Sequence, residues 1–199
     1  MVLNKKIIGI FGGSGSGKTT ATKILNEKIK NSTVLFLDPF MHQHWEEHKK
    51  EILDALNVKE DKNIWWRNYI TKSAETIKQS IDFINLEIEQ DIKNFISENQ
   101  KHDIIIIDWA FIPYISLFND CDFTICIDAD PETKINRLSS RLEDNNRLQK
   151  WPKEALLGRI NNTTLNKFGY NAKYNIENDG TIEDLRCKLY KIIKDEDFY

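Results

Sequence analysis

Four glycines, a lysine and a threonine lie close together near the amino terminus, in the stretch GGSGSGKTT at 12–20. Glycine lets the backbone turn so that successive amide N–H groups point at one anion, because no Cβ obstructs the turn. A lysine and a hydroxyl directly after such a turn, here Lys18 and Thr19, are the groups that contact terminal phosphates and Mg²⁺. The stretch therefore predicts a binding site for the phosphates of a nucleoside triphosphate.

The spacing fits G-x-x-x-x-G-K-[ST] at every fixed position, between an expected strand and an expected helix. The residues expected to bind the nucleotide here are Gly12, Gly13, Ser14, Gly15, Ser16, Gly17, Lys18, Thr19 and Thr20. The rival ligand is a dinucleotide, since Asp38 follows at the distance where such folds place a ribose-binding acid. That reading requires G-x-G-x-x-G, and Lys18 stands where the third glycine would be. We therefore expect ATP and Mg²⁺ as ligands.

Two carboxylates follow apolar stretches at the points where the chain is expected to leave a sheet. Asp38 ends VLFLD and is expected to accept the proton of an incoming hydroxyl, although Asp before Pro is also typical of a turn. Asp108 ends DIIIID and is expected to hold Mg²⁺ with Thr19; a strand-end or helix-capping role is the alternative. Asp103 is expected to be structural, and Asp128 or Asp130 to cap the next helix.

Arginines gather after the fourth expected strand, in RLSSRLEDNNRL. Arg137 and Arg141 are four residues apart and share a helix face, and Arg147 follows in a polar loop. Mobile arginines can cover the charge that develops on a transferred phosphoryl group, so Arg141 is a catalytic candidate. Arg159 on a later helix is a weaker candidate. A solvated helix surface would explain the same residues.

Short β-branched stretches alternate with longer helical patterns along the chain. The expected strands span 5–11, 33–37, 103–108, 122–128 and 172–177. An isoleucine stripe predicts one long helix over about 73–99, Pro131 begins another, and an amphipathic helix closes the chain. This order predicts an α/β fold: a three-layer domain with a five-stranded parallel sheet and right-handed crossovers, and a single domain over 1–199.

Composition narrows the function class. The 199 residues carry a net charge of −3, which gives no sign of a nucleic-acid-binding protein. The apolar stretches are far shorter than the roughly 20 residues that a membrane helix needs, and residues 1–11 leave no room for a signal peptide. Three scattered cysteines are expected to be reduced thiols. We expect a cytoplasmic protein with no membrane partner.

With these motifs together, the chain resembles the small-molecule kinases of the P-loop superfamily. The glycine loop with Thr-Thr and LDPF is similar to uridine kinase. FNDCDFTICIDADPETKINRLSSR, ALLGRINN and AKYNIENDGTIEDL resemble the corresponding parts of dephospho-CoA kinase, with Asn162 where that family has Gln. The likeness covers about 1–40 and 103–195. It fails across 41–102, where we expect a helical acceptor-site insertion, and we expect a lid at 142–152.

The resemblance also implies residue roles. The lid arginine would be Arg141, helped by Arg147, and the turn at Asn178-Asp179-Gly180 would border the adenine, which adds Asp179 and Gly180 to the nucleotide site. The expected reaction is transfer of the γ-phosphate of ATP to a hydroxyl of a small molecule, with dephospho-CoA as first acceptor. A nucleoside such as uridine, or nicotinamide riboside, is the alternative. A non-catalytic nucleotide-binding switch is the remote one.

The insertion contains two clusters whose roles stay open at this point. His44 and His48 lie one helical turn apart, but Trp45 replaces the glutamate of H-E-x-x-H, so a solvated helix is expected rather than a zinc site. His42 follows the Asp38 region closely and could contact the acceptor. NIWWRNY brings together Trp65, Trp66, Arg67 and Tyr69, which could contact a nucleobase and a phosphate or pack in the core or a dimer interface. The sequence does not give the oligomeric state.

Overall fold

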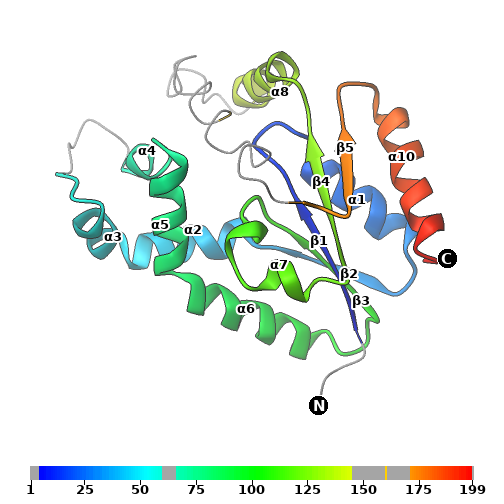
Figure 1. The fold of residues 1–199 in the computed structure, drawn as a ribbon, viewed down its shortest axis with the longest axis horizontal. Coiled ribbons are helices and arrows are strands. Elements are labelled where there is room, and N and C mark those ends of the chain that lie inside the picture. Colours follow the sequence, from blue (N-terminus) through cyan, green and yellow to red (C-terminus); the bar gives the residue numbers. More distant parts are fainter. Residues whose placement is uncertain (1–4, 60–65, 145–159, 161–170, 199) are drawn as a thin grey trace.

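A computed structural model describes residues 5–59, 66–144, 160 and 171–198 (Figure 1). The predictions for Trp65, Arg147, Arg159 and Asn162, and for most of the lid at 142–152, lie outside these residues.

The sheet has five parallel strands in the order β2-β3-β1-β4-β5. The strands are β1 (Lys6–Phe11), β2 (Ser32–Phe36), β3 (Ile104–Asp108), β4 (Phe123–Asp128) and β5 (Tyr174–Glu177). Four lie within the predicted stretches and β2 begins one residue earlier, at Ser32, which confirms the expected sheet. Because every strand points the same way, the loops after their carboxyl ends meet along one edge, where open α/β sheets bind ligands.

Side chains of β3 alternate between two hydrophobic cores, one on each face of the sheet. Ile104 and Ile106 belong to the core under α1 (Lys18–Lys28) and α10 (Ile182–Asp195). Ile105 and Ile107 belong to the opposite core, which the helices between β2 and β4 cover. Figure 1 shows α1 and α10 together on one side of the sheet. The continuous isoleucine run is thus explained by burial on both faces.

The crossover from β2 to β3 is helical in its described residues. It contains α2 (Asp38–Glu47), α3 (Lys49–Ala55), α4 (Arg67–Ile70), α5 (Ala74–Phe83) and α6 (Asn85–Glu98). The insertion expected over 41–102 lies in this crossover, and its described elements are helices.

The prediction of one long helix over 73–99 is wrong. The chain breaks at Ile84, where φ is −106° and ψ is 11°, and the Ile84 N–H bonds to the Ile81 carbonyl three residues back. The stripe residues are nevertheless buried on both sides of the break: Ile77, Ile81, Ile84, Ile88 and Ile92. The spacing of the isoleucines correctly predicts which face is buried. It does not predict the break, because α5 and α6 bury the same stripe.

After β3, the 3-10 helix η1 (Ile112–Tyr114) and α7 (Leu117–Asp120) lead into β4, and α8 (Pro131–Asp144) follows it. The helix predicted from Pro131 is confirmed. Asp130 caps it, accepting from the Thr133 amide at 2.8 Å and the Thr133 hydroxyl at 2.6 Å. These hydrogen bonds lower the pKa of Asp130 to about 2.

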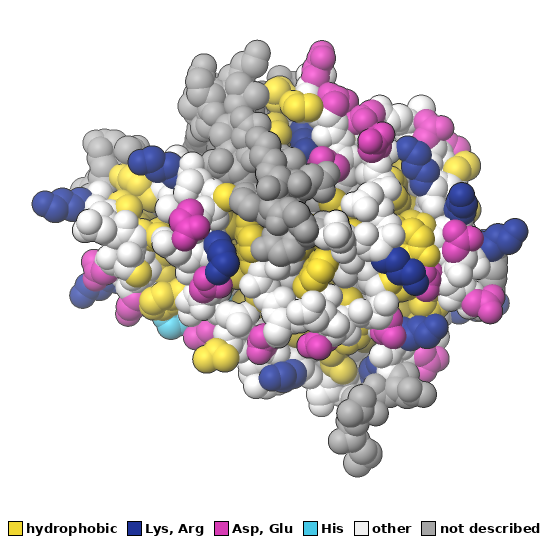
Figure 2. Space-filling view, in the orientation of Figure 1, with side chains coloured by type: hydrophobic (Ala, Val, Ile, Leu, Met, Phe, Trp, Pro, Cys, Tyr) yellow, Lys and Arg dark blue, Asp and Glu magenta, His cyan; other side chains and the backbone are white. Residues whose placement is uncertain are grey.

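None of the helices in the part of the chain that the structure describes has the length and apolar character needed to cross a bilayer. On the face shown in Figure 2, the coloured Lys and Arg side chains are interspersed with Asp and Glu rather than gathered in one patch.

Candidate active site at the carboxyl edge of the sheet

The glycine loop connects β1 to α1 at the centre of the carboxyl edge. Its glycines are required by close packing against neighbouring elements. A Cβ on Gly12 would lie 2.1 Å from the Ile127 carbonyl oxygen, and one on Gly17 would lie 2.3 Å from Nδ2 of Asn178. Gly17 also has a φ of 93°, a conformation that residues with a Cβ rarely adopt. The loop is therefore held tightly between β4 and the turn after β5.

Lys18 is the first residue of α1 and forms an ion pair with Asp108, at 2.5 Å between Nζ and Oδ1. Asp108 ends β3 and is 2% exposed. Its second oxygen, Oδ2, is buried without a hydrogen-bond partner among the described residues. Thr19, Thr20 and Ser14 are at least partly accessible, whereas Ser16 is buried. The pair thus leaves one acidic oxygen able to accept a further polar ligand beside the loop.

Two side chains from outside the loop hold its outer side. Asn178, buried in the turn after β5, donates from Nδ2 to the Ser16 carbonyl at 2.8 Å. Arg137 on α8 donates from Nη1 to the carbonyls of Gly15 and Ser16, each at 3.4 Å. These bonds to the Gly15 and Ser16 carbonyls fix the conformation of the loop. Arg137, a predicted site residue, thus lies against the loop.

The turn after β5 is tied to the start of α8. Oδ1 of Asp179 accepts from the Asp130 amide at 2.7 Å, and the Asn178 amide donates to the Asp128 carbonyl at 2.7 Å. A Cβ on Gly180 would lie 2.6 Å from Oδ2 of Asp184. Asp179 and Gly180 were predicted from the resemblance, whereas Asn178 had been assigned no role of its own. Its place beside them in the N-D-G motif was the available signal.

Lys134 on α8 was also missed. Its side chain is 2% exposed and its ammonium pairs with Asp128 at the end of β4. The backbone of Lys134 borders Gly15, where an added Cβ would lie 2.8 Å from the Lys134 carbonyl oxygen. From the sequence, a lysine at the fourth position of an amphipathic helix is expected to lie at the surface. Only the packing of α8 over the loop shows that it is buried.

Asp38 begins α2 beside the end of β3. The amide of Leu37, directly before it, donates to the Asp108 carbonyl at 3.2 Å. Asp38 itself is exposed. The order along the edge is therefore Asp38 after β2, Asp108 on β3 and the glycine loop after β1. This brings together the three groups predicted for acceptor, metal and nucleotide.

Arg141 lies in the last turn of α8, one turn beyond Arg137, and is exposed. Its position at the end of the helix that packs on the glycine loop is compatible with a role over the nucleotide.

The histidines of α2 correct one expectation. His44 is not solvated: its side chain is 12% exposed and lies between two carboxylates. Nε2 lies 2.7 Å from Asp91 on α6, and Nδ1 lies 3.1 Å from Glu47. Burial alone would lower the pKa of His44, but the hydrogen bonds to Asp91 and Glu47 raise it above its ordinary value. His48 makes a similar contact, 3.3 Å from Glu87 on α6.

The described part of the tryptophan cluster packs against α2. Trp66 is buried and donates from Nε1 to Glu46 at 3.3 Å. Arg67 donates to the same carboxylate at 2.7 Å. Core packing is thus part of the role of this cluster, as one of the two sequence readings expected.

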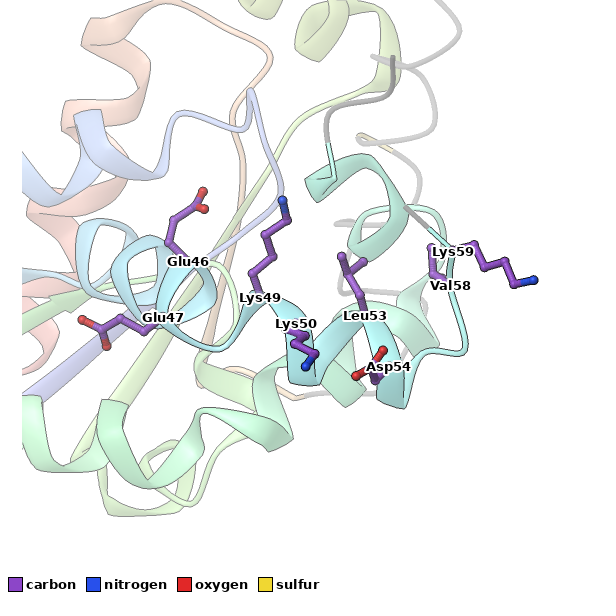
Figure 3. A pocket seen from close by; sticks show the side chains of 8 residues that line it. All are labelled: Glu46, Glu47, Lys49, Lys50, Leu53, Asp54, Val58 and Lys59. Atoms are coloured by element: carbon purple, nitrogen blue, oxygen red, sulfur yellow. The ribbon is translucent and has the colours of Figure 1, made fainter. Parts of the chain in front are cut away.

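A pocket of about 650 Å³ lies at the junction of α2 and α3 (Figure 3). It is lined by Glu46, Glu47, Lys49, Lys50, Leu53, Asp54, Val58 and Lys59. In the close-up, Glu46 and Lys49 point to the same side of these helices, whereas Lys50 points the other way.

Curated kinases are similar to this chain in sequence. No family model matches the chain. It is 28% identical over 200 residues to the dephospho-CoA kinase of Leptospira interrogans, covering 94% of this chain and 92% of the relative. The dephospho-CoA kinase of Borreliella burgdorferi is 30% identical over 142 residues, 68% of each chain. A uridine kinase of Latilactobacillus sakei is 25% identical over 141 residues, 68% of this chain and 65% of the relative.

Solved structures support the fold. TT1252 from Thermus thermophilus superposes with a TM-score of 0.68 at 19% identity, covering 96% of this chain and 97% of the other. The dephospho-CoA kinase from Campylobacter jejuni gives a TM-score of 0.52 at 18% identity, with 96% and 97% covered. The predicted resemblance to both kinase families is confirmed.

Proposed function

The chain belongs to the dephospho-CoA kinase family, and from this premise we propose that it transfers the γ-phosphate of ATP to a hydroxyl of dephospho-CoA. Membership makes it an ATP-dependent kinase with a small-molecule acceptor. The observation that carries the proposal to named residues is the order of Asp38, Asp108 and the glycine loop along one sheet edge. Phosphoryl transfer needs an acceptor-activating group, charge neutralisation and a phosphate cradle side by side.

In this proposal the amides of the glycine loop and Lys18 bind the phosphates. Asn178 and Arg137 hold the loop from its other side, so its N–H groups keep their direction. Thr19 and Asp108 are the residues that would hold Mg²⁺. Oδ2 of buried Asp108, which has no hydrogen-bond partner in the described part of the chain, and the Thr19 hydroxyl are hard oxygen donors of the kind that this ion prefers. Bound Mg²⁺ supplies positive charge against the phosphates.

Asp38 accepts the proton of the attacking hydroxyl in this mechanism. Its exposure at the start of α2, next to the end of β3, leaves the carboxylate accessible to an acceptor. Arg141, with Arg147 after it in the chain, covers the charge on the transferred phosphoryl group and excludes water. Asp179 and Gly180 border the nucleoside. We further propose that the protein acts in the cytoplasm.

The experiment is an ATP-consumption assay with Mg²⁺ against dephospho-CoA, uridine, cytidine, nicotinamide riboside and pantothenate. We expect turnover with dephospho-CoA. Asp38→Asn should lower kcat by about 10²- to 10⁴-fold, because the attacking hydroxyl loses its proton acceptor. Asp82→Asn, which changes an exposed carboxylate on α5, is the matched control and should keep full activity.

Other outcomes separate the alternatives. Turnover with uridine and none with dephospho-CoA would support nucleoside phosphorylation, the activity named for the relative from Latilactobacillus sakei. Tight ATP binding without turnover on any acceptor would instead point to a nucleotide-binding switch and overturn the kinase reaction. Full activity of Asp38→Asn would remove Asp38 from the mechanism.

A further inference from the structure

The contact between α2 and α4 lies one helical turn beyond Asp38. Asp38, His42 and Glu46 follow at intervals of four residues and so lie on one face of α2. Arg67 donates from Nη2 to the His42 carbonyl at 3.4 Å and to Glu46 at 2.7 Å. A helix rises about 1.5 Å per residue, which separates His42 from Asp38 by about 6 Å along the axis. The guanidinium thus contacts α2 one to two helical turns beyond Asp38.

Arg67 also makes the net charge beside the pocket at the junction of α2 and α3 more positive. The adjoining pocket is lined by three carboxylates and three lysines, so its own charges balance. Arg67 adds one positive charge beside Glu46. Lys49 lies on the same cluster, since its Nζ and the Cζ of Arg67 are each 5.8 Å from the centre of the Trp66 ring. Two cations therefore flank one buried indole at the edge of the pocket.

Glu46 is a partner that an anionic ligand can replace. Its side chain is 51% exposed, whereas that of Arg67 is 15% exposed. An exposed carboxylate gains little from its ion pair and is well solvated when it turns away. A guanidinium, by contrast, forms two parallel charge-assisted bonds with the oxygens of a phosphate. The arginine is the fixed member of this pair and the glutamate is the exchangeable one.

We propose that Arg67 selects acceptors that carry a phosphate or diphosphate ester, by exchanging Glu46 for the acceptor's phosphate oxygens. Lys49 adds a second positive charge to the same site. The inference rests on the proposed function, because dephospho-CoA contains a diphosphate and uridine contains no phosphate. It assigns substrate selection to the junction of α2 and α4, apart from the residues that bind ATP.

The test is steady-state kinetics of Arg67→Gln with dephospho-CoA and ATP. We expect the KM for dephospho-CoA to rise about 10- to 100-fold, the range for losing a hydrogen bond to a charged group, with the KM for ATP unchanged. Arg67→Lys should give a smaller rise, since it keeps the charge and loses the fork. Arg186→Gln on α10, an arginine paired with Glu183 at the surface, is the control and should change neither constant.

Glu46→Gln separates ligand binding from a structural role. Removal of the competing carboxylate should lower the KM for dephospho-CoA or leave it unchanged. Equal rises in KM for Arg67→Gln and Glu46→Gln would show that the pair merely braces α4 against α2, and would overturn the inference. So would an unchanged KM in Arg67→Gln. A wild-type protein that ignores dephospho-CoA would instead refute the proposed function, which keeps the two failures distinguishable.

Discussion

The proposed nucleotide side and the proposed acceptor side of this molecule are built in different ways. The proposed nucleotide side is the glycine loop at 12–17 with the first residues of α1, and its shape depends on contacts to the backbone, such as Asn178 to the Ser16 carbonyl. The acceptor side is assembled by side-chain pairs between segments far apart in the chain. Glu46 with Arg67 and His44 with Asp91 are its main examples.

This difference predicts how well each side tolerates substitutions. A glycine loop fails when a Cβ is added, because backbone atoms of other elements lie against it. A helix held by ion pairs keeps its place when one pair is altered, because partly exposed pairs contribute about 1 kcal/mol or less each. Replacing a group that forms or holds the glycine loop should therefore disturb the local structure more than altering one of these ion pairs. Three variants test this ranking, in addition to those of Asp38 and Arg67.

The largest effect is expected for Lys18→Met. It removes the cation proposed to bind the phosphates and also the partner of buried Asp108. We expect kcat/KM to fall by about 10³-fold or more, the range for removing one preorganised electrostatic contact to the transferring group. ATP-consumption kinetics measure this. Lys23→Met, an exposed position on α1, is the control, and a loss of less than tenfold in Lys18→Met would contradict the assigned role.

A smaller effect, confined to the nucleotide side, is expected for Asn178→Ala. The variant removes the shorter of the two hydrogen bonds to the carbonyl of buried Ser16, and the 3.4 Å bond from Arg137 remains. The KM for ATP should rise about tenfold, because losing a buried hydrogen bond costs about 1–3 kcal/mol. The KM for the acceptor should not change. Asn175→Ala, exposed on β5, serves as control, and a change in acceptor KM alone would break the division between the two sides.

The smallest effect is expected for His44→Gln, and it should depend on pH. The pKa of His44 is raised in the folded protein, so its protonated form stabilises the contact of α2 with α6. That stabilisation is full below the unfolded pKa of about 6.5 and is lost as pH rises through the folded pKa. Below this window the variant should melt about 2–4 °C lower than wild type. Above it, the difference should shrink.

Thermal melts at a series of pH values check this prediction. His102→Gln, at a histidine in the turn before β3, should keep the wild-type pH dependence. A Tm difference for His44→Gln that is constant from acid to alkaline pH would show that packing, rather than charge, carries the contact.

The sequence was sufficient for the parts of the molecule that are local in the chain. Five strands and the glycine loop follow from residue type and spacing alone, and strand order then brings Asp38, Asp108 and the loop to one edge. The burial of Lys134 and the bond from Asn178 depend on elements more than 100 residues from the glycine loop, and no local pattern encodes them. The bend at Ile84 could not be predicted from the sequence either, since the isoleucine stripe continues through it.

The crossover between β2 and β3 has an evolutionary consequence. Residues 37–103 leave the sheet and return to it, and their described part contributes helices and no strand. Lengthening such a segment costs little, since each doubling of a loop adds only about 0.6 kcal/mol to the entropy of closure. The crossover at 37–103 can therefore change during evolution to bind a new acceptor while the sheet and its glycine loop are conserved in structure. Divergence of specificity among such kinases needs no new catalytic core.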